Sequence, residues 1–368
     1  MAASELAALE PLTHRPLLLP PNRVYRLWRG GAVLDRLQGR PDPQDGTTPE
    51  EWIASTTVSR LPGRPADEGL SQVQLPGGGR LPLKALIAAF PRAMLGSAHV
   101  ARFGAELGVL CKLLDSAMRL FIQAHPDQEF ARAHLGSPFG KTEAWIVLAT
   151  REIAGERPYI LLGFTEGVGQ AEFRRLVQAQ DSAGMVRALN RVPVEPGQVF
   201  LLRAGAPHAL GPGVFLVEIQ EPTDLVVNAE YRLFGRPAEQ AFMGLPFDLA
   251  MQCFDYAAAG AAFLAAQRLA PRTLSAGADG LEERLIGPED TPHFGAARLT
   301  VQRALPDRDR GRCYAGIVVA GEGVLEGDGV SLPLRAGVTF FAPAASRHEA
   351  YRATAGPLTV IKCFPPRP

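Results

Sequence analysis

The sequence predicts a mainly β protein with helical insertions, built around two small β-barrels and a helical segment. Short strands separated by Pro and Gly turns fill VPVEPGQVFLLRAGAPHALGPGVFLVEIQEP, and they return from about residue 283 to the end of the chain. The runs VEPGQVFLLRAGAPHAL and PLRAGVTFFAPAASRHEA also resemble each other, since each has a strand, a Gly turn, an aromatic strand and a His. Two similar β regions indicate an internal duplication of one barrel.

Between these β regions the spacing of apolar residues changes to that of helices. Apolar residues recur every three or four positions around 81–110 and again in 166–190. In the stretch between them, RLFIQAHP is expected to be a strand, EFARAHL a helix and TEAWIVLAT a strand. The expected units are a first barrel with a helical insertion around 81–110 (residues 1–237), a helical connecting segment (238–275) and a second barrel (276–368).

Charge and composition exclude several classes of partner. Lys plus Arg and Asp plus Glu number 38 each, and there is no run of like charges. Neither a nucleic acid nor an anionic membrane surface is therefore expected as a partner, and a small molecule is favoured. No apolar run approaches the roughly 18 to 20 residues that a membrane-spanning helix needs. We expect a monomer or a weak homodimer.

The beginning of the chain and the cysteines indicate a cytoplasmic protein. The first residues, MAASELAALEPLTHRPLLLPP, lack a basic stretch before the apolar residues, unlike a secretory signal. The four cysteines have no CxxC spacing, so a structural zinc module or a redox pair is not expected. We interpret all four as reduced thiols of the core: Cys111, Cys253, Cys313 and Cys363.

Four residues form a candidate metal site. Gln123 and His125 are two apart on a predicted strand, so their side chains point to the same face. Glu143 opens the next strand, which a hairpin-like return through a Gly- and Pro-containing loop would bring to that face, and His208 follows the turn AGAP. Two imidazoles, a carboxylate and an amide suit a catalytic zinc. Each residue alone is more often structural, and the spacing alone does not decide between the two readings.

Several motifs, in order, resemble the type I mannose-6-phosphate isomerase family of the cupin superfamily. They are CKLLDS, IQAHPD, GKTEAW, AGAPHALGPG and EIQEPTD, which together span roughly 110–224, with weaker support from PEEWIAS. The resemblance implies a double cupin with a helical insertion. It also implies one zinc ion per chain, other divalent metals being possible, held by Gln123, His125, Glu143 and His208.

The same resemblance implies a reaction and further site residues. These isomerases interconvert mannose 6-phosphate and fructose 6-phosphate by moving a proton between C1 and C2 through a cis-enediol. Glu218 matches an active-site carboxylate and is the candidate base, although a salt-bridged strand Glu is an equal alternative. Lys141 and Lys112 match family lysines near the sugar phosphate; we assign Lys141 to catalysis with Glu218, and Lys112 to substrate binding.

Two positions depart from the family pattern. Phe121 stands where the family has a Ser, and Asn228 stands where it has an Arg. Arg232 or Arg236 could replace that cation, and Asn228 and Arg232 complete the predicted substrate-binding set. A changed substrate such as an unphosphorylated aldose, an altered variant, and a phosphate site rebuilt from other residues all remain open. A sugar-binding cupin without catalysis is a further alternative, whereas an iron oxygenase is disfavoured by the Gln ligand and the missing HxH pair.

The second barrel is expected to be structural. No HxH, no QxH and no nearby Glu precedes His348 in the expected strands. We therefore predict that His348 is a core or surface residue and that this barrel covers apolar surface of the first one.

Overall fold

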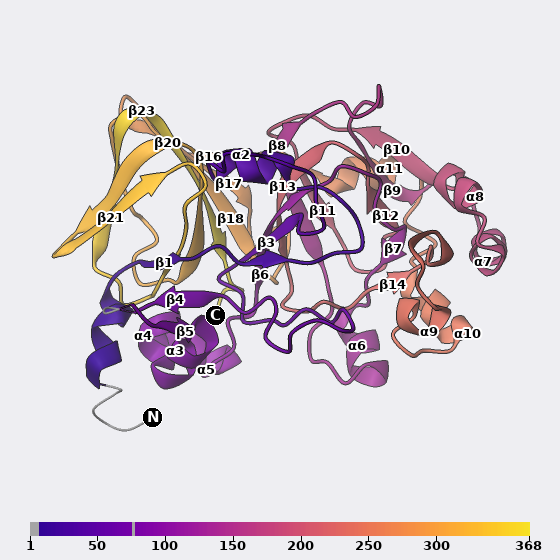
Figure 1. The fold of residues 1–368 in the computed structure, drawn as a ribbon, viewed down its shortest axis with the longest axis horizontal. Helices are drawn as coiled ribbons and strands as arrows, with labels where there is room; N and C mark the ends of the chain where they lie inside the picture. Colours follow the sequence, from indigo (N-terminus) through magenta and orange to yellow (C-terminus); the bar gives the residue numbers. More distant parts are fainter. Residues whose placement is uncertain (1–6, 76–77) are drawn as a thin grey trace.

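Antiparallel sheets dominate the computed structural model, which describes residues 7–75 and 78–368 (Figure 1). Two β units lie side by side, with helices at their lower edge and at the far end of the first unit (Figure 1). The mainly β class with two β units and helical insertions is confirmed.

The first barrel consists of a seven-stranded sheet and a five-stranded sheet. In spatial order the larger sheet contains β15 (Arg268–Leu269), β11 (Val199–Leu202), β8 (Glu143–Thr150), β13 (Val214–Gln220), β6 (Leu110–Asp115), β3 (Glu50–Ile53) and β2 (Arg23–Val24). The smaller sheet contains β10 (Leu189–Pro193), β9 (Tyr159–Phe164), β12 (His208–Leu210), β7 (Gln123–Ala124) and β14 (Val227–Asn228). One apolar cluster, which includes Trp145 and Leu216 from the larger sheet and Leu162 from the smaller one, packs between them.

The second barrel is a single sheet of nine strands. They are β1 (Leu17–Leu19), β22 (Thr339–Ala342), β20 (Tyr314–Gly327), β23 (His348–Phe364), β18 (Gly295–Val301), β17 (Gly280–Ile286) and β16 (Arg272–Gly277), with β19 (Ala304–Pro306) on β23 and β21 (Val330–Arg335) on β20. The pairing of β20 with β23 shifts register several times, which bends this long ladder around its own apolar core. Strand β1 pairs with β22, so an early segment of the chain completes the later barrel.

Most helices lie where helical spacing predicts them. They are α2 (Ala32–Leu37), α3 (Leu83–Ala89), α4 (Pro91–Leu95), α5 (Ser97–Phe103), α6 (Gln128–His134), α7 (Gln170–Ala179), α8 (Ser182–Arg187), α9 (Ala238–Ala241), α10 (Phe247–Ala250) and α11 (Gly260–Gln267). Short 3-10 turns are η1 (Glu10–His14), η2 (Arg232–Phe234) and η3 (Met251–Cys253), and β4 (Gln72–Gln74) pairs with β5 (Arg80–Pro82).

The predicted helical ranges are longer than the helices themselves. The insertion around 81–110 holds α3 to α5 and ends at Phe103, and strand β6 already begins at Leu110. In the 238–275 segment the last helix ends at Gln267, and strands β15 and β16 follow. Strand β1 pairs with β22 of the second barrel, and β15 of the connecting segment pairs with β11 of the first barrel. The sheets thus cross the expected units, and the boundaries at 237 and 275 stay a prediction.

Successive side chains along the strands of the larger sheet point alternately to an apolar core shared with the second barrel and to the interior of the first barrel. Cys111 and Leu113 of β6 face a core that also contains Ile361 and Cys363 of the second barrel. Lys112, between them on the strand, points to the interior of the first barrel, because successive side chains lie on opposite faces. One apolar core thus joins the two barrels, as expected for a barrel that covers the first.

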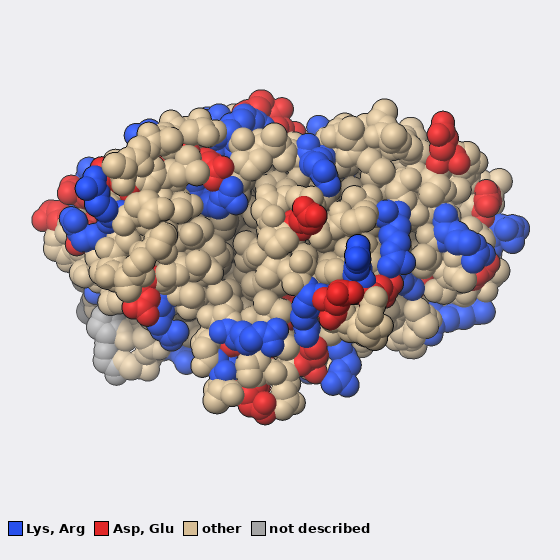
Figure 2. Space-filling model, turned by 90° about the horizontal axis from the view of Figure 1, so that it is seen from above, with Lys and Arg blue, Asp and Glu red and all other residues tan. Residues whose placement is uncertain are grey.

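The surface and the cysteines agree with the composition. Basic and acidic side chains are interspersed on the face seen in Figure 2, which carries no continuous patch of one sign. All four cysteines are free and buried. Within the described residues, no helix is both long and apolar enough to cross a membrane.

Candidate metal centre and substrate cavity

Three predicted ligands meet between the two sheets of the first barrel. The ligand atoms of His125, Glu143 and His208 all lie within 4.8 Å of one another, and all three side chains are buried. His208 begins β12 and His125 follows β7, both on the smaller sheet, whereas Glu143 begins β8 on the larger sheet. The hairpin-like return that the sequence suggested for Glu143 is therefore wrong, because its carboxylate reaches the site from the opposite wall.

Hydrogen bonds to the backbone orient both imidazoles. Nδ1 of His125 donates to the carbonyl oxygen of Leu225 at 2.8 Å, and Nδ1 of His208 donates to that of Ala206 at 2.8 Å. Each Nε2 is consequently the unprotonated nitrogen, and its lone pair faces Glu143, at 3.2 Å and 3.3 Å. Burial lowers the pKa of both rings, that of His125 to about 3 with help from the charge of Lys141. Both histidines are thus in the neutral form that binds metals.

The Glu143 carboxylate lacks the hydrogen bonds that a buried carboxylate needs. Neither oxygen has a hydrogen-bond partner, although Lys141 Nζ lies 2.9 Å from Oε2 outside hydrogen-bond geometry. Burial alone would raise the pKa of Glu143, but the Lys141 ammonium outweighs it and holds the pKa well below the ordinary value. Two imidazole lone pairs and a carboxylate without a hydrogen bond face one point, where the Lys141 ammonium now supplies the positive charge. These donors fit a divalent metal, which would take the place of that ammonium.

Gln123 is the fourth predicted ligand and lies beside the other three. Its Nε2 is 3.2 Å from Nε2 of His208. A half-turn about the last side-chain bond exchanges the amide oxygen and nitrogen, and the oxygen is the atom that ligates a metal. Gln123 is thus close enough to the centre to act as a ligand in the other amide orientation.

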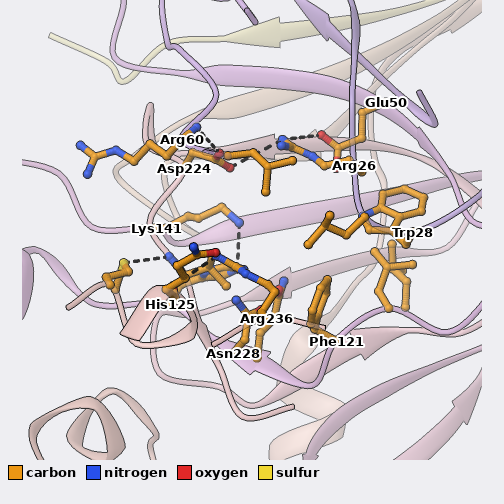
Figure 3. A pocket seen from close by; sticks show the side chains of 18 of the residues that line it. Arg26, Trp28, Glu50, Arg60, Phe121, His125, Lys141, Asp224, Asn228 and Arg236 are labelled. Carbon is orange, nitrogen blue, oxygen red and sulfur yellow. Dashed lines mark hydrogen bonds and ion pairs between the residues drawn. The ribbon is translucent and has the colours of Figure 1, made fainter. Parts of the chain in front are cut away.

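A cavity of about 510 Å³ opens beside this centre (Figure 3). Of the predicted catalytic and substrate residues, Glu218, Lys141, Lys112 and Asn228 line it. Lys112 on β6 donates to Glu218 on β13 at 2.6 Å, and Trp145 Nε1 donates to the other oxygen of Glu218 at 3.1 Å. Lys141 lies deeper, 2.8 Å from Nε2 of His125. Burial lowers the pKa of Lys112, but Glu218 and Glu50 outweigh it and raise the pKa above its ordinary value.

One wall of the cavity holds residues that sequence reasoning missed. Arg26 pairs with Glu50 at 2.8 Å and approaches Asp224 at 3.7 Å, and the Arg60 backbone N–H donates to Asp224 (Figure 3). Burial raises the pKa of Glu50, but Arg26 and Lys112 outweigh it and lower the pKa to about 2. The signal available in the sequence was Glu50 itself, a carboxylate at the start of the strand EEWI.

The opposite wall holds the two departures from the family pattern. Asn228 and Phe121 both line the cavity, and Arg236 lies beside them (Figure 3). Arg232 is exposed and is not among the lining residues, so the structure does not bring it to the predicted substrate set. Arg236, which the sequence offered as the other choice, is the arginine at the cavity.

The second barrel contains a different polar cluster. His348 is buried and lies 2.7 Å from Asp307 Oδ2, which also accepts from Tyr314, while Lys362 donates to Asp307 Oδ1 at 2.7 Å. His348 is thus a core residue, as predicted. The His125, Glu143 and His208 group is the only set of three or more metal-ligating side chains found in the part of the chain that the structure describes.

Comparison with known proteins agrees with the motifs. No protein-family model matches the chain. A Bacillus subtilis protein named "Probable mannose-6-phosphate isomerase GmuF" is 31% identical over 217 residues, which is 58% of this chain and 60% of that protein. The mannose-6-phosphate isomerase of Streptococcus mutans is 31% identical over 209 residues, which is 57% of this chain and 58% of that protein. The chain is similar in sequence to proteins named mannose-6-phosphate isomerase. The matched part spans less than two thirds of either relative.

Solved structures of mannose-6-phosphate isomerases show the same fold over almost the whole chain. That of the Bacillus subtilis enzyme has a TM-score of 0.73 at 22% identity and covers 95% of this chain and 99% of the other. A mutant phosphomannose isomerase from Salmonella typhimurium has a TM-score of 0.70 at 18% identity and covers 96% and 100%. At such identities the likeness concerns the fold, and the resemblance of the motifs to mannose-6-phosphate isomerases is confirmed by the curated relatives.

Proposed function

We propose that the chain is a metal-dependent aldose–ketose isomerase that interconverts mannose 6-phosphate and fructose 6-phosphate. The observation that carries the proposal is the convergence of two oriented imidazole lone pairs and an orphaned carboxylate at the floor of a sugar-sized cavity. The names of the relatives support the same activity. Zinc is the proposed metal because an open set of imidazole, carboxylate and amide donors suits a catalytic zinc site.

His125, Glu143 and His208 would hold the metal, with Gln123 as the fourth ligand. A divalent metal bound there would supply Lewis-acid chemistry, which polarises the sugar carbonyl and favours the developing enediolate. Lys141 stands 2.8 Å from one ligand atom and 2.9 Å from another, so its ammonium must withdraw towards the cavity when a metal binds. In that position Lys141 can donate a proton to a sugar oxygen.

Glu218 is the proposed base for the proton at carbon. It would take the proton from C2 of the aldose, leaving a cis-enediol, and return it to C1, while the O2 proton passes to O1. No net oxidant or reductant is needed. Lys112 and Trp145 each hold one oxygen of Glu218, which fixes the carboxylate for proton transfer over a short distance.

An unphosphorylated aldose such as mannose is the second candidate substrate. The Phe121 ring on the cavity wall favours it, because this apolar surface stands where the resembled family has a hydroxyl. A sugar-binding protein without catalysis has less support, since the Lys112–Glu218 pair provides groups for proton transfer that binding alone does not need.

The experiment is an isomerisation assay of zinc-loaded protein with mannose 6-phosphate and with mannose, each in D₂O. We expect mannose 6-phosphate to be converted to fructose 6-phosphate, with deuterium entering at C1 or C2 as seen by NMR. The Glu218→Gln variant should lose both conversion and exchange while binding zinc normally. Exchange and conversion that persist unchanged in Glu218→Gln would reject Glu218 as the base, and their absence in the unmodified protein would favour the non-catalytic alternative.

Location and assembly remain proposals with less support. We infer a cytoplasmic monomer or weak homodimer that acts on a small sugar, on the basis of the balanced charge and the free cysteines. Size measurement in solution tests the oligomeric part.

A further inference from the structure

The cations of the cavity differ in whether a carboxylate neutralises them. Arg26 has Glu50 at 2.8 Å and Lys112 has Glu218 at 2.6 Å. Lys141 has Glu143 at 2.9 Å, a contact that a bound metal would replace, but it lies at the metal end of the cavity. The charges of Arg26 and Lys112 are therefore already compensated inside the protein and offer little net attraction to an anion.

Arg236 is the contrasting case. Among the described residues no carboxylate oxygen lies within 4.0 Å of its guanidinium, and its buried Nε has no hydrogen-bond partner. One of its terminal nitrogens donates to the Gln240 carbonyl at 3.2 Å, which holds the group without neutralising it. Burial lowers the pKa of Arg236, and the charge of Asp224 offsets this only in part. A partly buried, unpaired guanidinium at a cavity is a receptor for an anion.

Asn228 adds an independent observation beside it. Its side chain is 1% exposed and lines the cavity, and its Nδ2 donor has no partner. Leaving a buried donor unpaired costs free energy, so a ligand oxygen at this point would be favoured. Figure 3 shows Asn228 and Arg236 next to each other on the same wall of the cavity.

Packing around Phe121 explains how Arg236 reaches this wall. The Phe121 ring packs against Phe234, with centroids 3.8 Å apart and the ring planes tilted by 31°, and the Arg236 guanidinium lies 6.0 Å from the centre of the Phe121 ring. This contact holds the turn that carries Arg236 against the cavity, whereas Arg232 at the start of the same turn stays exposed. The two departures from the family pattern thus act together: Phe121 anchors the turn, and the short Asn228 leaves space for the arginine that the turn delivers.

We propose that Arg236 and Asn228 together bind the phosphate group of a phosphorylated aldose in this cavity, in place of the arginine expected at position 228. The inference rests on the proposed function and identifies the substrate as a sugar phosphate. The guanidinium donates to the phosphate oxygens as a charged pair, and the Asn228 amide donates one further hydrogen bond. The metal end of the cavity then receives the carbonyl end of the same sugar.

The test compares Arg236→Gln with the unmodified zinc-loaded protein in two assays. In the kinetic assay, kcat/KM for mannose 6-phosphate should fall about tenfold or more, as expected for one lost charge-assisted hydrogen bond, with mannose much less affected. In calorimetry, the unreactive glucitol 6-phosphate should bind about tenfold or more weakly to the variant, while glucitol should bind both proteins alike. Asn228→Ala should show the same selectivity for the phosphate with a smaller loss.

Arg232→Gln is the matched control, because it removes an arginine charge of the same turn that lies outside the cavity. It should not change the ratio of phosphorylated to unphosphorylated ligand as Arg236→Gln does. Arg60 also lines the cavity with no carboxylate oxygen of the described residues within 4.0 Å of its guanidinium, so Arg60→Gln tests the rival arginine. A phosphate-selective loss in Arg60→Gln or Arg232→Gln and not in Arg236→Gln overturns the proposal, as does an equal loss for both ligands in Arg236→Gln. Calorimetry with glucitol 6-phosphate keeps the proposal separate from the proposed function: phosphate-selective binding without isomerisation would reject only the catalytic assignment.

Discussion

Each barrel buries histidine and carboxylate side chains, but the two barrels neutralise them differently. In the first barrel the oxygens of Glu143 have no hydrogen-bond partner, and two imidazole lone pairs face them. In the second barrel Asp307 accepts from Tyr314, His348 and Lys362, and none of its atoms is left without a partner. A buried polar cluster that satisfies itself stabilises the fold, whereas one with unpaired atoms at a cavity is ready to receive a ligand. The duplicated barrel therefore uses the same chemistry for structure in one copy and for a site in the other.

The largest expected effect is on the stability of the polar cluster in the second barrel, formed by Asp307, Tyr314, His348 and Lys362, which we call the closed cluster. Asp307→Ala leaves the ammonium of Lys362 and the ring of His348 without their main partner inside the barrel. Breaking a buried pair in this way should lower the free energy of unfolding by about 3 to 5 kcal/mol. Chemical denaturation measures the change. The variant should bind zinc with unaltered affinity as long as it is folded. Loss of zinc from the fully folded variant would contradict the distinction between the two barrels.

The next largest effect is on metal binding by His125, Glu143 and His208 in the first barrel, which we call the open cluster. His125→Ala removes one ligand and should weaken zinc binding by at least about 100-fold, the upper end of the effect seen for residues that only orient ligands. His348→Ala is the matched control, because it removes a buried histidine from the other barrel. Titration of both variants with zinc against a competing chelator tests the pair. Equal zinc affinity in the two variants would mean that the first barrel has been assigned the wrong role.

Acid should destabilise the closed cluster in a definite direction. Burial raises the pKa of Asp307, but the His348 hydrogen bond and the Lys362 charge outweigh it and lower the pKa below the ordinary value of 3.8. Because the folded state holds this proton less tightly, Asp307 stabilises the fold above pH 3.8 and the contribution is lost as the pH falls towards the folded pKa. In that window the slope from one proton is about 1.4 kcal/mol per pH unit. Asp307→Asn should remove this slope, and an unchanged slope in denaturation below pH 3.8 would contradict it.

The smallest expected effect is a loss of stability from a mutation in the core between the barrels, and it tests whether the two barrels unfold together. Ile361 of β23 is buried in the core that joins the barrels, so Ile361→Val should cost about 0.5 to 1.5 kcal/mol. All three tryptophans, Trp28, Trp52 and Trp145, lie in the first barrel, so their fluorescence reports on that barrel alone. We expect the fluorescence midpoint to shift with the mutation in the second barrel. A shift seen by circular dichroism but not by fluorescence would show that the barrels unfold separately.

Much of the fold was predictable because the strands alternate and the turns carry Gly and Pro. The duplicated β pattern predicted two barrels, and helical spacing predicted α3 to α5, α7 and α8. Helix ends were predicted less closely. Helix α5 ends at Phe103 before Gly104, whose φ is positive, whereas α11 ends at Gln267 because strand β15 begins at the next residue. The pairing of β1 with β22 joins residues more than three hundred apart in the chain, and no local pattern indicates it.

The candidate site was predictable in its residues and not in its construction. Spacing and motif order named His125, Glu143 and His208, because each belongs to a local run that the sequence displays. That Glu143 reaches the site from the opposite sheet depends on how two sheets pack, which is decided by burial over the whole barrel.

The sequence by itself determined which chemical groups this protein can bring to a site and the order in which they occur. Only the tertiary structure decided which of those groups are neutralised by a neighbour. Arg232 and Arg236 are equivalent candidates in the sequence, yet packing of Phe121 against Phe234 holds Arg236 at the cavity and leaves Arg232 exposed. His348 resembles a ligand in its motif, yet Asp307 satisfies it. The physical reason is that the effect of a charge depends on the distance and burial of its partners, which are set by contacts between residues remote in the chain.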